Sequence, residues 1–406
     1  MNLKTMQTKE VTPKTLIIVL GFLNGLMPFS TDLYLPAFPA MAENLDTNAG
    51  MITLSMSTYI AGAGVGQFFN GPILDRFGRK NPMLIALVLF FLTSLGCAFA
   101  SSIMILCIYR FFQAIAISVC NVGSRAMVRD VFPIDKIASV FSTLALIMGI
   151  APIIAPTLGG LILLHFDWRG IFIFLTLIAL ILFGALYFFL PHSSEADLNY
   201  SLKPKAILIN YSKVIKTNGF IGYTIVSSLS LSVLFSWISS SSILFIGSLG
   251  VSKQEFGWIF ACTASCMILG SQFNRILLRK FDSETIAFGA VATQLLICCF
   301  LLYTAIYAFT VMNLLIGMCL FMFFLSLISP NIMALILKPF TENIGSANAL
   351  MGVTSMLLSA VVTGIVSHFQ DGTAIPMVLT IILLSCISLS LQYSLKQKRI
   401  HSVSNS

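Results

Sequence analysis

Long apolar runs, each close to the length of a membrane helix, recur along the whole chain and constrain its fold. About 20 apolar residues in a helix cross the hydrocarbon core of a bilayer. Hydrophobic residues make up 57% of the 406 residues and charged residues 9%, whereas a soluble domain has about 25% charged residues. We therefore predict an all-α polytopic membrane protein with twelve transmembrane helices. The expected spans are 15–39, 50–72, 82–100, 103–126, 137–164, 169–190, 218–247, 255–274, 284–304, 307–336, 344–367 and 374–394.

The positive charges support this number of spans. A net charge of +8 would favour a nucleic-acid partner in a soluble protein, but here the cations are scattered in short loops between apolar runs. With both termini in the cytoplasm, 20 of the 23 Lys and Arg residues fall in cytoplasmic segments. Arg169 and Lys253 fall on the other side, and Arg110 lies within a span. This bias follows the positive-inside rule, so we expect a multi-pass protein of the cytoplasmic (inner) membrane and no nucleic-acid partner.

A polar break separates six spans from six and predicts two related bundles. Asn70 at the end of the second span corresponds to Asn274 in the eighth, and similar neighbours recur at the same offset of 204 residues. A parallel six-span repeat predicts such a match. The copies differ in charge, since Asp75 corresponds to Arg279 and Asp32 to Ser236. The expected parts are an N-terminal bundle at 1–190, a cytoplasmic linker at 191–217, a C-terminal bundle at 218–395 and a cytoplasmic tail at 396–406.

Asp32 and Arg110 are predicted to lie at similar depths, each about seven residues from the outer end of its span. A charge within a membrane span is costly and indicates a functional site. An ion pair facing a shared cavity is the least costly arrangement for both residues. Desolvation favours the neutral form of Asp32 and Arg110 favours the charged form, so Asp32 is a candidate proton carrier. The alternative is a static pair that ties the first span to the fourth.

Three motifs resemble one family of transporters. Residues 71–80, Gly-Pro-Ile-Leu-Asp-Arg-Phe-Gly-Arg-Lys, resemble the loop signature of the major facilitator superfamily. Residues 149–160 resemble the antiporter signature of its drug-exporting branch, and residues 31–39 resemble the first span of the bicyclomycin-resistance (Bcr/CflA) subfamily. The resemblance implies two pseudo-symmetric six-helix bundles, the major facilitator fold. It also implies a gating loop of Gly71, Asp75, Arg76, Gly78, Arg79 and Lys80, and an antiporter helix with Gly149, Pro152, Pro156, Gly159 and Gly160.

The resemblance assigns contacts to the gating loop, and residue spacing suggests contacts for the fifth span. It implies that Asp75 contacts the start of the eleventh span, near 341–345, and either Arg129 or Arg125. A simple solvated, positively charged loop is the alternative. In the fifth span, Ala151, Ala155 and Gly159 recur at four-residue spacing, which favours close helix packing. We interpret this stripe as the seam between the halves, with ordinary packing within a bundle as the alternative.

The substrate cavity is expected to combine aromatic walls with a few polar groups, as suits amphiphilic small molecules. The candidate lining residues are Phe29, Tyr34, Tyr59, Gln113, Asn121, Phe235 and Trp237. The nine cysteines all lie in apolar runs without metal-ligand spacing, so we expect no disulfide framework, metal or cofactor.

The leading hypothesis is a monomeric, proton-coupled exporter of small amphiphilic molecules or drugs that works by alternating access. A carrier of the same fold for a metabolite or siderophore, exporting or importing, is the main alternative. A channel or sensor would favour continuous polar faces or a soluble domain, and neither is evident. The sequence has no pattern of a catalytic or nucleotide-driven enzyme. The expected partners are a small-molecule substrate, protons and the lipid bilayer.

Overall fold

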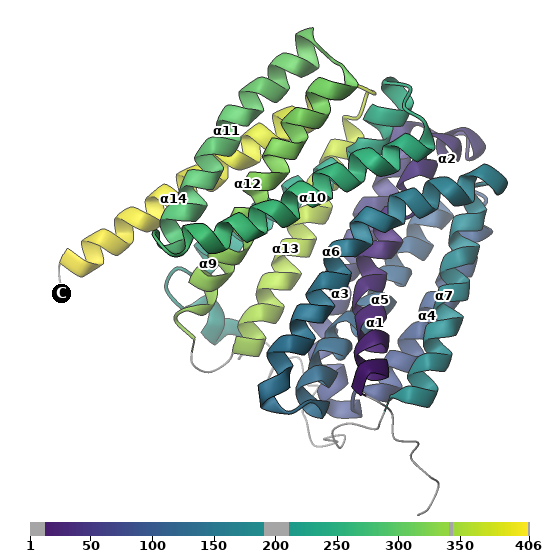
Figure 1. Ribbon diagram of the computed structural model, residues 1–406, viewed down its shortest axis with the longest axis horizontal. Coiled ribbons are helices and arrows are strands. Elements are labelled where there is room, and N and C mark those ends of the chain that lie inside the picture. Colours follow the sequence, from purple (N-terminus) through teal and green to yellow (C-terminus); the bar gives the residue numbers. More distant parts are fainter. Residues whose placement is uncertain (1–12, 191–210, 341–343, 405–406) are drawn as a thin grey trace, which may run out of the picture.

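The computed structural model describes residues 13–190, 211–340 and 344–404, and these residues form helices and short connections without a strand. Helices α1 to α7 lie side by side as one bundle and α9 to α14 as a second (Figure 1). The first bundle contains α1 (Pro13–Asp32), η1 (Leu35–Ala37), α2 (Phe38–Asn44), α3 (Ala49–Phe77), α4 (Lys80–Ala98), α5 (Ile103–Val131), α6 (Ile134–His165) and α7 (Trp168–Phe189). The second contains α9 (Phe220–Ser242), η2 (Ile243–Ser248), α10 (Lys253–Leu277), α11 (Ser283–Tyr307), α12 (Val311–Leu337), α13 (Ile344–His368) and α14 (Ile375–Ser404).

These helices confirm an all-α polytopic membrane protein. Eleven helical segments of the described chain are long and apolar enough to cross a membrane. Helix α3, at the position of the second predicted span, is 29 residues long but less apolar. Its small and polar residues, such as Thr53, Ser55 and Ser57, are buried against other helices rather than exposed to lipid. Most of the predicted linker, 191–210, lies outside the described residues.

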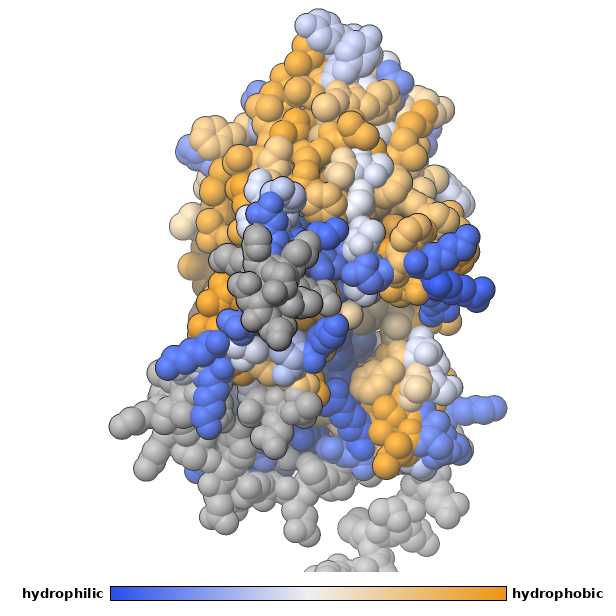
Figure 2. Space-filling model, turned by 90° about the vertical axis from the view of Figure 1, so that its left-hand side faces the viewer, coloured by the Kyte–Doolittle hydropathy of each residue, from blue (hydrophilic) through white to orange (hydrophobic). Residues whose placement is uncertain are grey.

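Exposed apolar side chains cover the helices on the outside of the molecule. Leu296 on α11 is 73% exposed and Leu383 on α14 is 60% exposed, as expected where a helix faces lipid. Figure 2 shows one side of the molecule, on which hydrophobic residues form a broad surface and hydrophilic residues gather toward one end. We call the end where α1 begins and where α3 and α5 end the basic end. The end where α1 finishes, at Asp32, is the opposite end.

Local signals set several helix boundaries. The side chain of Asn48 accepts a hydrogen bond from Met51 N at 2.9 Å and begins α3. Ser252 and Glu255 form a reciprocal capping box at the start of α10. Gly78 has a φ of +77° between α3 and α4, a conformation that favours glycine and permits the sharp reversal of the chain there.

The first span is not the single helix predicted for 15–39. Helix α1 ends at Asp32, and the chain continues as the short η1 and α2. Pro36 and Pro39 lie in the first turn of η1 and α2, where a missing N–H is tolerated. These prolines cannot donate to the preceding turn, which is why the helix is interrupted directly after Asp32.

In each half, a matching asparagine joins the same pair of helices by a hydrogen bond. Asn70 on α3 donates to Ser118 Oγ on α5 at 2.9 Å. At the matching position of the second half, Asn274 on α10 accepts from Asn331 on α12 at 2.7 Å. Each bond joins the second long helix of its half to the fourth, so the offset of 204 residues reflects an internal structural repeat.

The halves meet along α3 with α13 and along α6 with α10. Ser57 on α3 donates to the Ala360 carbonyl oxygen on α13 at 2.6 Å. Near the opposite end, a β-carbon added at Gly160 of α6 would lie 2.7 Å from the Lys253 carbonyl oxygen of α10. The prediction that the fifth span, α6, lies at the seam is therefore confirmed. The predicted face of α6, which includes Gly159, is wrong. Gly159 packs against the backbone of Leu33 within the first bundle, whereas its neighbour Gly160 contacts the second.

Candidate transport site and latch

Arg110 is the most deeply buried charge of the first bundle, with no exposed surface. Its guanidinium lies between two tyrosine rings, 4.3 Å from the centroid of Tyr34 and 4.1 Å from that of Tyr59. Cation–π contacts of this kind contribute about 2 kcal/mol or more when they are desolvated. The break after α1 brings Tyr34 into this position, so the interrupted helix builds half of the cradle.

Hydrogen bonds fix the orientation of Arg110. Its Nη1 donates to Gln113 Oε1 at 2.6 Å and to the Ser30 carbonyl oxygen at 3.3 Å. Gln113 in turn donates to Ser94 Oγ of α4 at 2.7 Å. The Nε and Nη2 atoms of Arg110 are buried without a hydrogen-bond partner. A buried unpaired donor costs about 1–3 kcal/mol, which leaves this group ready to bind an acceptor.

Asp32 lies at the end of α1 and is 2% exposed. Its carboxylate accepts a hydrogen bond from Thr31 Oγ1 at 3.0 Å. The predicted Asp32–Arg110 ion pair is not formed, since the ion pairs within the described residues involve other groups. The physical reason is that Arg110 is already held by two tyrosine rings and Gln113. Arg110 contacts the carbonyl oxygen of Ser30, two residues before Asp32, and both charges are buried, so the two residues belong to one buried cluster.

The predicted cavity residues fall into separate environments. Tyr34, Tyr59 and Gln113 surround Arg110. Asn121 donates to the backbone and side-chain oxygens of Asn24 on α1 at 3.2 and 3.1 Å, so it ties α5 to α1. Trp237 is 1% exposed and packs edge-on against Phe245 at 6.0 Å, inside the second bundle. Phe29 and Phe235 are half-buried.

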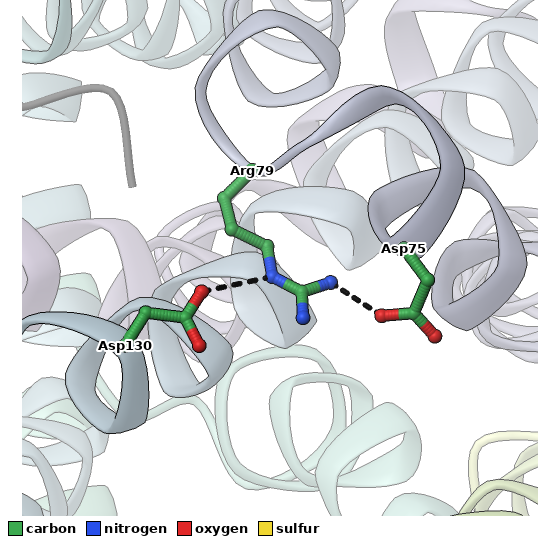
Figure 3. Close-up of polar contacts among 3 residues, drawn as sticks. All are labelled: Asp75, Arg79 and Asp130. Carbon is green, nitrogen blue, oxygen red and sulfur yellow. Dashed lines mark hydrogen bonds and ion pairs between the residues drawn. The ribbon is translucent and has the colours of Figure 1, made fainter. Parts of the chain in front are cut away.

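Arg79 organises the loop between α3 and α4. Its Nη1 donates to Asp75 at 2.6 Å and its Nε donates to Asp130 at 3.2 Å, as Figure 3 shows. Burial lowers the pKa of Arg79, but the hydrogen bonds and charges of Asp75 and Asp130 outweigh it and raise the pKa above its usual value. We call Asp75, Arg79 and Asp130 the latch. It joins the ends of α3 and α5 to the start of α4.

The latch differs from the contacts that the resemblance implied. Asp75 pairs with Arg79 rather than with Arg129 or Arg125. Most of the expected partner region at 341–345 cannot be compared, since 341–343 lie outside the described residues. Asp130 was missed, although it directly follows Arg129 at the end of an apolar run, where a counter-charge to a basic loop is expected. Lys80, a predicted member of the gating loop, donates to the Tyr187 and Leu190 carbonyl oxygens at the end of α7.

We expect Asp130→Asn to slow transport about two- to fivefold, because partly exposed ion pairs contribute about 0.2–1 kcal/mol. The measurement is the initial rate of substrate uptake into everted membrane vesicles, normalised to the amount of protein. Asp167→Asn is the matched control, since Asp167 pairs only with its neighbour Arg169 at the start of α7. An equal loss in both variants would contradict a specific role for the latch.

Comparison with known proteins supports the arrangement of helices. Residues 20–364 match the Major Facilitator Superfamily. The chain belongs to this superfamily. It is 31% identical over 386 residues to a bicyclomycin resistance protein homolog of Haemophilus influenzae, covering 95% of this chain and 97% of that protein. It is 27% identical to the multidrug resistance protein MdtL of a Shewanella species, covering 82% and 84% of the two chains.

Solved structures show the same fold at low sequence identity. The crystal structure of a peptide transporter in complex with sulfate aligns with a TM-score of 0.77 and 11% identity, over 95% of this chain and 94% of that one. The xylose transporter XylE of Escherichia coli aligns with a TM-score of 0.74 and 13% identity, over 95% and 97%. This major facilitator protein is therefore a multi-pass membrane carrier for small molecules rather than an enzyme.

Proposed function

We propose that this major facilitator protein exports small amphiphilic molecules or drugs across the cytoplasmic membrane in exchange for protons. The names of its relatives, which concern bicyclomycin and multidrug resistance, support a drug as substrate. The observation that carries the proposal is the buried cluster of Asp32 and Arg110. An intramembrane carboxyl group without an ion-pair partner can take up and release a proton as access alternates between the two sides.

The orientation follows from the charges. The basic end carries Arg79, Lys80 and Arg129, so we place it and both termini in the cytoplasm. The α6–α10 contact at Gly160 lies near the opposite end, which then faces outward. The half of α6 near the basic end includes exposed side chains such as Leu146, 62% exposed. These features favour a state closed toward the outside, and we expect one chain to form a complete carrier.

The test is uptake into proteoliposomes with an imposed pH gradient, using a panel that includes bicyclomycin and cationic, neutral and anionic drugs. We expect uptake of at least one compound against its gradient when protons flow the other way, and none when the pH gradient is collapsed. Uptake that follows an imposed sodium gradient instead would overturn the proton assignment. Movement of the compound in the same direction as the protons would overturn the exporter assignment.

A further inference from the structure

Arg125 is a second arginine within the membrane-spanning helix α5, although the charge pattern of the sequence placed it among the cytoplasmic cations. It lies six residues before the end of the helix at Val131. At 100° per residue, Asn121 and Arg125 lie within about 60° of Arg110 around the helix. The three side chains therefore form one stripe that faces α1, and contacts from Arg110 to Ser30 and from Asn121 to Asn24 follow it.

The guanidinium of Arg125 lies further from the basic end than the backbone position of Arg125 in α5 indicates. Side chains of a helix lean toward its N-terminus, and the N-terminus of α5 is at the opposite end of the molecule. Consistent with this direction, Arg125 Nε donates to Asn24 Oδ1 at 3.2 Å. Asn24 lies 11 residues after the start of α1 and eight before the end of that helix. The guanidinium thus lies about 16 Å from the start of α1 at the basic end, at 1.5 Å per residue.

Asn24 is in turn fixed by its neighbours. It is 1% exposed and accepts two hydrogen bonds from Asn121. Arg125 Nη2 also lies 3.7 Å from Met148 Sδ of α6, a weak acceptor. These contacts hold the guanidinium of Arg125 between α1, α5 and α6. Part of the Arg125 side chain is nevertheless exposed.

No carboxylate compensates Arg125 among the described residues. The acidic residues on α1, α5 and α6 are Asp32, Asp130 and Asp135. Asp32 lies eight residues beyond Asn24, Asp130 is held by Arg79, and Asp135 lies in the first turn of α6. A cation that faces lipid at the centre of a bilayer costs about 2.5–3.5 kcal/mol or more. The exposed surface of Arg125 is therefore expected to face polar groups or water rather than lipid.

We propose that Arg125 contacts the substrate and selects small molecules that carry a carboxylate or another anionic oxygen over permanent cations. The inference rests on the proposed function, in which a substrate that enters from the basic end would meet Arg125 before it approaches Asp32. Where α5 faces α1, the charged residues are Arg110, Arg125 and Asp32. Two positive charges against one negative charge disfavour the binding of a cation. A guanidinium offers paired donors that match an anionic oxygen group.

The test measures binding to the purified protein by fluorescence polarisation, with fluorescein and rhodamine 123 as probes. The two dyes share a xanthene core, but fluorescein is an anion at pH 8 and rhodamine 123 is a cation. We expect the wild-type protein to bind fluorescein at least about tenfold more tightly than rhodamine 123. Arg125→Gln should remove about tenfold of the fluorescein affinity. Arg125→Lys should keep the preference with weaker binding, because lysine lacks the paired donors.

Arg129→Gln is the matched control, since Arg129 is an exposed arginine one turn further along the same helix and nearer the basic end. It should bind fluorescein as the wild-type protein does. Equal binding of the two dyes, no binding of fluorescein by the wild type, or equal losses in the Arg125 and Arg129 variants would overturn the inference. If fluorescein binding depends on Arg125 but no pH gradient drives transport, the proposed function fails and this inference stands.

Discussion

Replacement of Asp32 by asparagine should reduce proton-driven transport to the background of empty vesicles. Asparagine keeps the shape of the side chain and can still accept a hydrogen bond from Thr31, but it cannot release a proton. Uptake driven by a pH gradient should therefore disappear. Exchange of labelled for unlabelled substrate across the membrane should remain, because exchange needs alternating access without net proton movement. Both rates are measured in the same proteoliposomes.

A matched variant separates the role of Asp32 from a general loss of negative charge. Asp46 is an exposed carboxylate in the turn after α2, close in sequence to Asp32. Its φ of +46° is a conformation that asparagine also tolerates. Asp46→Asn should retain gradient-driven uptake. Full gradient-driven uptake by Asp32→Asn would contradict the assignment of the proton carrier.

The second large effect is expected from Gly160→Leu on the seam between the halves. A β-carbon at this position would lie 2.7 Å from the Lys253 carbonyl oxygen, and this atom belongs to backbone that cannot rotate away. The larger side chain should keep α6 and α10 apart near the opposite end. We expect the outward-closed state to be depleted and transport to fall to near background. Distances between spin labels on α6 and α10, measured by pulsed electron resonance, should increase at the opposite end.

Gly184→Leu on α7 is the control, since a β-carbon at Gly184 would lie within 4 Å of no atom of another helix. This variant should transport at the wild-type rate and show unchanged label distances. Unchanged distances in Gly160→Leu, or an equal loss of transport in both variants, would show that the α6–α10 contact does not control closure.

The large-scale architecture could be predicted because it depends on one-dimensional patterns. Apolar runs predict the spans, and the cations in alternate loops predict one orientation in the membrane. Asn70, Asn274 and their neighbours indicated the repeat, and in the structure both asparagines form hydrogen bonds to corresponding helices, α5 and α12. Such patterns survive because every membrane helix must satisfy its backbone internally and expose apolar residues to lipid.

Side-chain partners could not be predicted in the same way. Asp32 and Arg110 were correctly expected near the same end, but equal depth does not determine which groups touch. Arg110 had two tyrosines and Gln113 as competing partners, and the break after α1 brought Tyr34 to it. In α6, Gly159 and Gly160 are neighbours in sequence that face different bundles. A stripe of small residues therefore predicts close packing but does not identify the helix it packs against.

The most direct measurement is proton release from the purified protein when substrate binds, followed in weakly buffered solution with a pH indicator. The substrate used is a compound that the proteoliposome panel identifies as transported. If Asp32 is the site at which proton and substrate compete, the wild-type protein should release a proton on binding, and Asp32→Asn should bind the compound without release. Release of the same amount by Asp32→Asn, or no release by the wild type, would contradict the account.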